Sequence, residues 1–439
     1  MKRKRLSFVC ILLCMSLLIM PVPASATNQT ATVDEIAAKS MAQAPALEAF
    51  NEIYDLVIFD TAETSEYHDY YSGSYINDEN VLVICVKKDG DALVNMINNA
   101  LGDEYEVDYE FCDWSKNEVL AFAKSEMSTL SSKATVTVNS GYYSAQDNAY
   151  ILEVTNTSEE PVLSSAAKRD SGIPVVIREV EVNQPIVCDN SDLEYEQTVT
   201  TTAVYTPIYG GMAMQLRCYH NNTYVPYIDG ATIALCGYFN GEPCVLTAAH
   251  CCMDTDDTQK DLYMDYNFTV HLEETSLQVR GTGDYAALKI PSGYIATNNI
   301  KTSSSGNVSP IAGYSTSLEI PENTIIYKYG AASELTASKV ISSTGSTGSY
   351  PDEVSPLFVS IPVYAEEYEN NPHNHDPIAD PGDSGGPVWT LNTQGGVIIV
   401  GIVQAKSNPT TDITVANKLY TTPIRFPLLA GFIPYGMVN

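Results

Sequence analysis

The feature that most restricts the fold is the long stretch from Ile208 to the end of the chain. Over roughly 230 residues it repeats short apolar runs separated by turns that carry Gly, Pro and Asn, with little helical periodicity. Regularly spaced short strands of this kind predict an all-β sandwich or barrel. The Ser, Thr and Gly composition of residues 342–349 predicts a flexible loop. We expect strands at residues 231–236, 268–272, 325–329, 357–363 and 397–403.

The preceding residues, 51–180, alternate between strand and helix patterns, which is typical of an α+β domain. Residues 184–207 lose this periodicity and are rich in Asp, Glu, Thr and Asn, as in an exposed acidic linker. The chain therefore divides into an α+β region with its linker, residues 27–204, and an all-β domain, residues 205–439. We expect strands at residues 81–86, 105–111, 135–138, 150–154 and 175–182, and helices at 92–101 and 118–127.

Residues 1–26 have the three parts of a secretory signal peptide. A basic start is followed by an apolar run of about 15 residues and by small residues that end at Ala26. A membrane anchor is the alternative, but a spanning helix needs about 20 apolar residues. We therefore expect cleavage near Ala26 and a secreted, extracellular product.

The charge of the chain argues against two classes of partner. The formal net charge is −31, and the predicted signal peptide holds four basic and no acidic residues, so the mature chain is near −35. Nucleic acids and anionic membranes attract basic surfaces, so neither is expected as a partner after signal removal. A strongly acidic surface suits a protein that stays soluble outside the cell.

Ser384 is surrounded by glycines in the run Gly382-Asp-Ser-Gly-Gly-Pro387. A serine hydroxyl becomes a good nucleophile only when a base takes its proton. Flanking glycines let the backbone turn sharply and bring amide N–H groups close to an oxyanion that forms on attack. The same motif also occurs in ordinary turns, so its interpretation depends on a base elsewhere in the chain.

The positions of the histidines decide which kind of hydrolase site is possible. Gly-x-Ser-x-Gly also occurs in α/β-hydrolases, where the histidine follows the serine in the chain. The last histidine here is His375, so the base must precede Ser384. The run Thr247-Ala-Ala-His250-Cys251 supplies a histidine, and Asp284 follows it by 34 residues and precedes Ser384 by 100. This His, Asp, Ser order is the chymotrypsin order.

The three motifs, in this order, resemble those of the chymotrypsin-like (trypsin-like) serine proteases over residues 205–439. Asp380-Pro381, just before the serine motif, is similar to the bacterial streptogrisin-type branch. The resemblance implies two six-stranded antiparallel β-barrels with the catalytic cleft between them. It implies His250 as general base and acid, Asp284 as the group that orients it, and the amides of Gly382 and Ser384 as the oxyanion hole.

The resemblance also implies that Asp383 is buried and that Cys236 and Cys251 form a disulfide. The pairing of the other cysteines stays open: Cys244 and Cys252 have each other, Cys188 or Cys218 as candidate partners, and Cys85 has Cys112. No cofactor is expected. His373 and His375 form an H-x-H pair without a third ligand placed by spacing, so a solvated loop is favoured over a metal site.

The substrate pocket is expected around Ile378, where trypsin-like members carry an aspartate, so cleavage after Lys or Arg is not expected. By the same resemblance Lys406 falls on the substrate-pairing strand and Lys418 behind the pocket. In one interpretation both lysines point to solvent and the pocket accepts apolar side chains. In the other, one lysine reaches the pocket and favours an acidic residue before the cut. Asp380 stands where many relatives have a pocket disulfide cysteine.

Residues 27–204 resemble the pro-regions of bacterial secreted proteases in size and position. We expect this region to assist folding and to block the cleft until it is cut away; an accessory binding domain is the alternative. Ile208 begins an I-x-G-G run like the start of mature relatives, and its free amine is a candidate partner for Asp383. The sequence thus predicts a secreted serine endopeptidase that acts on polypeptides and is made as a proenzyme. A non-catalytic binding protein on a protease-like fold and an esterase are the alternatives.

Overall fold

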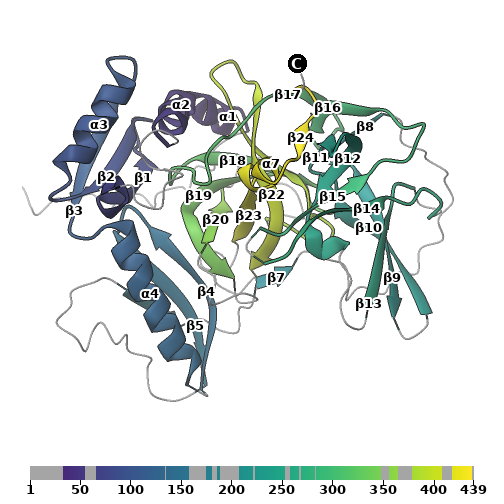
Figure 1. Cartoon of the computed structure of the whole chain (residues 1–439), viewed down its shortest axis with the longest axis horizontal. Coiled ribbons are helices and arrows are strands. Elements are labelled where there is room, and N and C mark those ends of the chain that lie inside the picture. The colour runs from purple at the N-terminus through teal and green to yellow at the C-terminus, as the bar shows by residue number, and fades with distance from the viewer. Residues whose placement is uncertain are drawn as a thin grey trace, which may run out of the picture.

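In the computed structural model, an N-terminal region (described residues up to Val187) lies beside a mostly β C-terminal region (described residues from Pro207 onward) (Figure 1). The predicted signal peptide lies outside the described residues. No helix among those that are described is long and apolar enough to span a bilayer. The structure describes residues 33–54, 66–133, 135–157, 175–179, 185–187, 207–220, 223–252, 258–265, 268–281, 283–347, 355–363, 378–407 and 418–437.

Six strands of the C-terminal region close into a barrel. Each is antiparallel to both neighbours in the ring β18-β19-β20-β23-β22-β21, and β21 pairs back with β18. Alternate residues of a strand face one side, and Ile326, Val340, Phe358 and Leu419 are fully buried in one core. This closed barrel is the second barrel that the family resemblance implies. Its strands are β18 (Ile325–Gly330), β19 (Glu334–Thr347), β20 (Ser355–Pro362), β21 (Pro387–Leu391), β22 (Val397–Ser407) and β23 (Leu419–Pro423).

The other half of the C-terminal region has two sheets around a shared core. One has the order β10-β9-β13 and the other the order β14-β15-β12-β11-β24. Met214 and Leu216 of the first sheet belong to the same buried cluster as Val245 and Leu288 of the second. The connecting strand β17 is parallel to β22 of the closed barrel and so joins the two halves. The elements are β8 (Ile208–Gly210), β9 (Ala213–His220), β10 (Thr223–Thr232), β11 (Leu235–Phe239), β12 (Glu242–Thr247), η4 (Ala249–Cys251), β13 (Thr258–Tyr263), β14 (Glu273–Val279), β15 (Tyr285–Lys289), β16 (Ala296–Lys301), β17 (Val308–Tyr314), α7 (Arg425–Leu429) and β24 (Ile433–Pro434).

The N-terminal region contains two small sheets, each covered by a helix. Helix α3 packs on the sheet β1-β2-β3, and α4 packs on the strands β4, β5 and β6. Helix α4 begins where the sequence favours it, because Ser115 and Glu118 form a capping box. The predicted α+β pattern is therefore confirmed. The elements are α1 (Val33–Ala42), α2 (Ala44–Ile53), η2 (Glu66–Asp69), β1 (Tyr71–Ile76), β2 (Leu82–Lys87), α3 (Asp91–Leu101), β3 (Val107–Cys112), α4 (Lys116–Ser131), β4 (Val136–Ser144), β5 (Ala149–Asn156), β6 (Val175–Glu179) and β7 (Pro185–Val187).

The N-terminal region extends the sheet of the closed barrel. Strand β4 pairs antiparallel with the end of β19, with Tyr142 opposite Gly345 and Ser140 opposite Thr347. Helices α1 and α2 contact the barrel from another side (Figure 1). There the buried Gln43 side chain donates to the Asn323 carbonyl and accepts from the Ile325 amide, each at 2.9 Å. The two regions are therefore joined by a continuous sheet and by a buried polar clamp.

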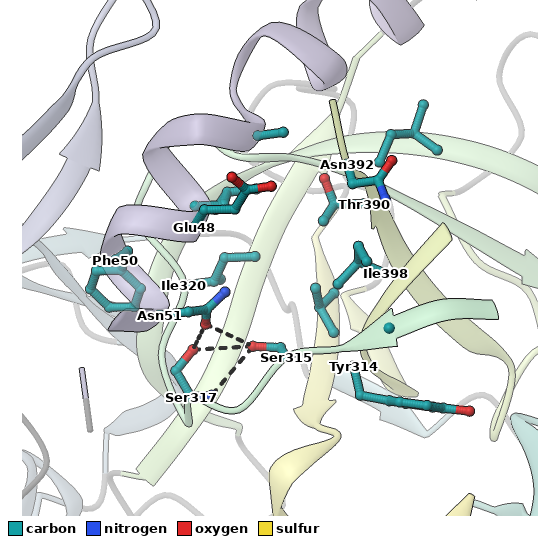
Figure 2. Close-up of a pocket in the computed structure, with 15 residues that line it drawn as sticks. Glu48, Phe50, Asn51, Tyr314, Ser315, Ser317, Ile320, Thr390, Asn392 and Ile398 are labelled. Atoms are coloured by element: carbon teal, nitrogen blue, oxygen red, sulfur yellow. Dashed lines mark hydrogen bonds between the residues drawn. The ribbon is translucent and has the colours of Figure 1, made fainter. Parts of the chain in front are cut away.

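A cavity of about 220 Å³ lies between α2 and the closed barrel. Figure 2 shows Asn51 of α2 pointing toward Ser315 and Ser317. The Asn51 side-chain oxygen accepts from their hydroxyl groups, at 3.4 Å from Ser315 and 2.9 Å from Ser317. Much of the remaining lining is apolar, with Ile398 and Val400 among it. These bonds across the cavity add a second polar link between the two regions.

Three sequence expectations are wrong. Residues 268–272 form a turn rather than a strand, because the Asp265 carboxylate accepts the amide N–H groups of Thr269 and Val270. The expected strand 231–236 is divided between β10 and β11. The predicted loop at 342–349 is strand as far as Thr347, since β4 and β20 pair with it. Helices α1 and α2 have no counterpart among the elements predicted from the sequence.

Candidate active site

His250, Asp284 and Ser384 come together at the junction of the two halves. The His250 Nδ1 atom lies 2.5 Å from Asp284 Oδ2, and Nε2 lies 2.8 Å from Ser384 Oγ. Asp284 Oδ1 also accepts the His250 amide N–H at 3.0 Å. The three residues are at most 5% exposed. The structure therefore places the three predicted residues in one hydrogen-bonded line.

The local chain conformation brings each of them into place. His250 lies in the single turn η4, directly after strand β12. Asp284 directly precedes β15 and has a φ of 37°, in the left-handed region that non-glycine residues seldom occupy. Such local strain persists only where the surrounding structure enforces it, and it is often found at functional sites. Here it aims both carboxylate oxygens at one histidine.

Two opposing effects act on the protonation of His250. Burial lowers the pKa of the imidazole, because a charged ring is poorly solvated in the interior. The neighbouring Asp284 carboxylate favours the charged ring, and the net pKa is raised above its ordinary value. Asp284 therefore makes His250 a stronger proton acceptor than a buried histidine on its own.

The loop around Ser384 is shaped by two glycines in the left-handed region, Gly382 at φ 103° before it and Gly385 at φ 85° after it. A Cβ added at Gly385 would come within 2.0 Å of the Thr247 hydroxyl oxygen, so only glycine fits there. The Gly382 carbonyl accepts from the Thr232 hydroxyl at 2.7 Å. Among the described residues, the amide N–H groups of Gly382 and Ser384 have no hydrogen-bond partner. Both donors are therefore available to an oxyanion.

Asp383 is fully buried, as the resemblance implies, and its partner is Lys328 at 2.6 Å. The amides of Ala332, Ser333 and Asp380 also donate to this carboxylate. Burial would raise the pKa of Asp383, but the Lys328 ammonium outweighs this effect and the pKa is lowered. Lys328 is a residue that sequence reasoning missed, since nothing in its strand pattern marks a buried cation.

The predicted contact between Asp383 and a free amine of Ile208 is not present in this structure. The Asp383 oxygens are already occupied by Lys328 and three amides. The Ile208 amide is part of strand β8 and donates to the Ile295 carbonyl at 2.8 Å. The loop of residues 380–386, here called the nucleophile loop, is therefore held in place by Lys328 of the closed barrel.

The residues predicted for the pocket separate into two environments. Ile378 belongs to a buried apolar cluster with Ala379, Val403 and Leu419. Leu419, the first residue of β23, shares the cluster of Ile378, whereas Lys418, the residue before the strand, does not. The strand register needed to see this could not be read from the sequence.

Neither lysine points to solvent, in contrast to one of the two sequence interpretations. Lys406 is 6% exposed and forms an ion pair with Asp380 at 2.9 Å. Lys418 is 2% exposed and forms an ion pair with Glu153 of β5 in the N-terminal region. Both cations are therefore neutralised by carboxylates in this structure.

A short strand of the N-terminal region lies along the end of β22. β7 is antiparallel to β22, with Val187 opposite Ala405 and Ile186 opposite Lys406. Nearer the start of β22, Val403 accepts from the Gly385 amide and donates to the Gly386 carbonyl, each at 2.9 Å, next to the nucleophile. The chain direction from Pro185 to Val187 is therefore toward Ser384.

The predicted disulfide between Cys236 and Cys251 is not formed in this structure, where both thiols are free and buried. The Cys236 Sγ atom lies 3.6 Å from the Ile208 carbonyl oxygen, to which it donates. Cys188, His373 and His375 lie outside the described residues. Within the described part of the chain, no three His, Cys, Asp or Glu side chains are grouped so as to hold a metal ion.

Comparisons with known proteins match both regions. Residues 220–422 match the Trypsin family model, and residues 35–107 match a model described as a Pro-like N-terminal domain. Among curated proteins, none matches the chain. Solved structures similar to it include a glutamic acid specific serine protease (17% identity, TM-score 0.37), Thermobifida fusca protease A (17%, 0.35) and a Nocardiopsis protease (16%, 0.33). Each match covers 52% of this chain, and 100%, 100% and 97% of those chains. The C-terminal region therefore contains a domain that matches the Trypsin family, over residues 220–422.

Proposed function

We propose that the protein is a secreted serine endopeptidase, made as a latent precursor, with His250, Asp284 and Ser384 as its catalytic triad. The observation that carries this proposal is the hydrogen-bonded line from Asp284 Oδ2 through His250 to Ser384 Oγ. A nucleophile, a base and a group that orients the base are the parts that acyl transfer needs.

The reaction follows from the geometry. Asp284 accepts a hydrogen bond from the Nδ1–H group of His250, which leaves the Nε2 lone pair directed at the Ser384 hydroxyl. As Ser384 Oγ attacks a peptide carbonyl carbon, its proton moves to Nε2 and the carbonyl oxygen becomes an oxyanion. The amides of Gly382 and Ser384 stabilise that charge. His250 then protonates the leaving amine, which leaves an acyl-enzyme on Ser384. Water attacks this acyl-enzyme while His250 takes a proton from the water, and His250 then returns the proton to Ser384 Oγ as the acid product leaves.

We further propose that the N-terminal region keeps the precursor inactive. Strand β7 occupies the edge of β22 that a substrate would pair with, and Ser384 is 0% exposed. The N-terminal region is also tied to the closed barrel by buried ion pairs, Glu153–Lys418 and Lys116–Glu319. This arrangement favours an inhibitory pro-region over an accessory binding domain.

The apolar cluster of Ile378, Ala379, Val403 and Leu419 supports a preference for apolar side chains before the cut. The alternative preference, for acidic side chains, requires Lys406 or Lys418 to exchange its present carboxylate partner for the substrate. We favour the apolar preference because no exchange is needed.

Labelling with a fluorophosphonate, before and after removal of the N-terminal region, tests the proposal. We expect stoichiometric labelling of the processed protein, slow labelling of the precursor and none of Ser384→Ala. Absence of labelling after processing would instead support a non-catalytic binding protein. Hydrolysis of esters without cleavage of casein or peptides would support the esterase alternative.

A further inference from the structure

Lys260 of β13 makes a contact with the proposed general base that the chemistry described above does not use. Its Nζ atom donates to the main-chain carbonyl oxygen of His250 at 2.9 Å, and Lys260 is only 6% exposed. Together with the contacts to Asp284 and Ser384, this bond gives every polar atom of His250 a partner. The histidine is therefore held through both its ring and its main chain.

The contact connects two different sheets of this half of the fold. β13 belongs to the sheet β10-β9-β13, in which Lys260 lies opposite Cys218 of β9. His250 follows β12, which belongs to the other sheet of this half. A hydrogen bond from a charged donor is stronger than one between neutral groups, particularly where water is excluded. The turn η4 follows a strand of one sheet and is hydrogen-bonded through Lys260 to the other sheet, β10-β9-β13.

An ammonium group held at the main chain of His250 should disfavour a second positive charge on the ring, because charges interact over several ångströms in a buried site. The groups around His250 are Asp284 before β15, Ser384 in the nucleophile loop, and Cys251 and Cys252 in and after η4. Glu274 of β14 interacts with Cys252. Asp284 favours a protonated ring, whereas an ammonium group disfavours it.

We propose that Lys260 is a positioning residue for His250: it fixes the main chain of the general base and opposes protonation of its ring. The inference rests on the proposed catalytic role of His250. The Lys260 ammonium at the main chain and the Asp284 carboxylate at the ring together hold the imidazole in its orientation before Ser384 attacks.

The test compares Lys260→Met, Lys260→Gln and Lys260→Arg in processed enzyme, with kcat/KM measured per fluorophosphonate-labelled site. Removal of the cation raises the pH at which His250 loses its proton, so the acidic limb of kcat/KM shifts to higher pH. We expect a shift of about 0.5 to 1 pH unit in the two neutral variants, equivalent to a roughly three- to tenfold loss at acidic pH. Lys260→Arg keeps the charge and should keep the midpoint of the wild type.

The matched control is Lys289→Met, which removes a half-exposed cation from β15, near Asp284 in sequence. It should leave the midpoint unchanged. Neutral Lys260 variants with the wild-type midpoint would overturn the inference. If neutral variants are secreted but do not label, labelling of Lys260→Arg supports the inference, and failure of Lys260→Arg as well overturns it. Failure of the wild type to label would instead contradict the proposed function.

Discussion

Glu153 of strand β5 and Lys418, the residue before β23, form an ion pair in which each side chain is 3% exposed. The Ser140 hydroxyl donates to the other Glu153 oxygen at 2.6 Å, and the Lys418 ammonium lies 5.1 Å from the centre of the Tyr142 ring. Burial lowers the pKa of Lys418, even though Glu153 acts in the opposite direction. The pair is therefore a buried ionic contact between the N-terminal region and the closed barrel.

Breaking this pair should loosen the N-terminal region. Glu153→Gln leaves the Lys418 charge buried without a counter-charge, which typically costs about 3–5 kcal/mol. We expect a lower urea midpoint for the Ser384→Ala precursor carrying this substitution. The double variant Glu153→Gln/Lys418→Met should recover much of the loss. Lys88→Met, which breaks the exposed pair with Asp113, should cost less than about 1 kcal/mol; an equal cost at both sites would contradict the prediction.

Lys328→Met should destabilise the closed barrel and slow the chemistry together. The Asp383 carboxylate would be buried without its cation, again at a cost of about 3–5 kcal/mol, and the nucleophile loop would lose its brace. Because the pKa of Asp383 is lowered, its stabilising effect is present above the unfolded pKa and is lost as pH falls through the folded value. Urea midpoints and labelling rates should both fall at pH 7. A lower midpoint with an unchanged labelling rate would show that the loop does not depend on Lys328.

Glu322 should make the precursor less stable as the pH rises. Burial raises the pKa of Glu322 to about 8 from its ordinary 4.5, although the amides of Ala145 and Gln146 donate to it. Between these values the folded chain holds a proton that the unfolded chain has lost, so stability falls by up to about 1.4 kcal/mol per pH unit. In the Ser384→Ala precursor, Glu322→Gln should flatten this slope between pH 5 and 8. If stability falls with pH equally steeply in Glu322→Gln and in its parent, Glu322 is not the cause of the pH dependence.

Strand β7 should be necessary for latency. Ile186→Pro removes an amide N–H and fixes φ in the strand that pairs with β22, so the precursor should label faster from the first time points. Pro185→Ala serves as the control and should label at the parent rate. Since β7 is directed at Ser384, self-processing should yield N-termini downstream of Val187, and Ser384→Ala should remain uncut. Equal processing of Ser384→Ala would assign the cut to another protease.

Substrates with Leu or Phe before the scissile bond should be cleaved at least about tenfold faster than those with Glu. The surroundings of Ile378, at the predicted pocket, are apolar, and placing an ionised carboxylate there without a partner is costly. Lys406→Met should leave this ranking intact, because Lys406 is paired with Asp380. Cleavage rates on a peptide library, measured for the parent enzyme and for Lys406→Met, check both expectations. Equal or faster cleavage after Glu by the parent enzyme would contradict the apolar preference and would indicate that Lys406 or Lys418 binds the acidic side chain.

The residues of the proposed triad could be predicted from the sequence because short motifs carry them. His250, Asp284 and Ser384 each lie in a recognisable run, and their order excludes the hydrolase-elbow arrangement. The groups that support them could not be predicted in this way. Lys260 and Lys328 lie on ordinary strands, and only the pairing of those strands shows that their ammonium groups reach His250 and Asp383. Residues 342–349 have a loop composition, yet β4 and β20 pair with this segment.

The pairing of β4 with β19 has a consequence for the protein once the N-terminal region has gone. The backbone of residues 345–347 then loses the neighbour that used its N–H and C=O groups, and a strand edge opens to solvent. Open edges are templates for association with other chains. If activation removes the N-terminal region as we propose, the same cleavage exposes this margin on the enzyme. This margin is short and lined by Gly, Ser and Thr, without the bulky apolar side chains that would hold two copies together.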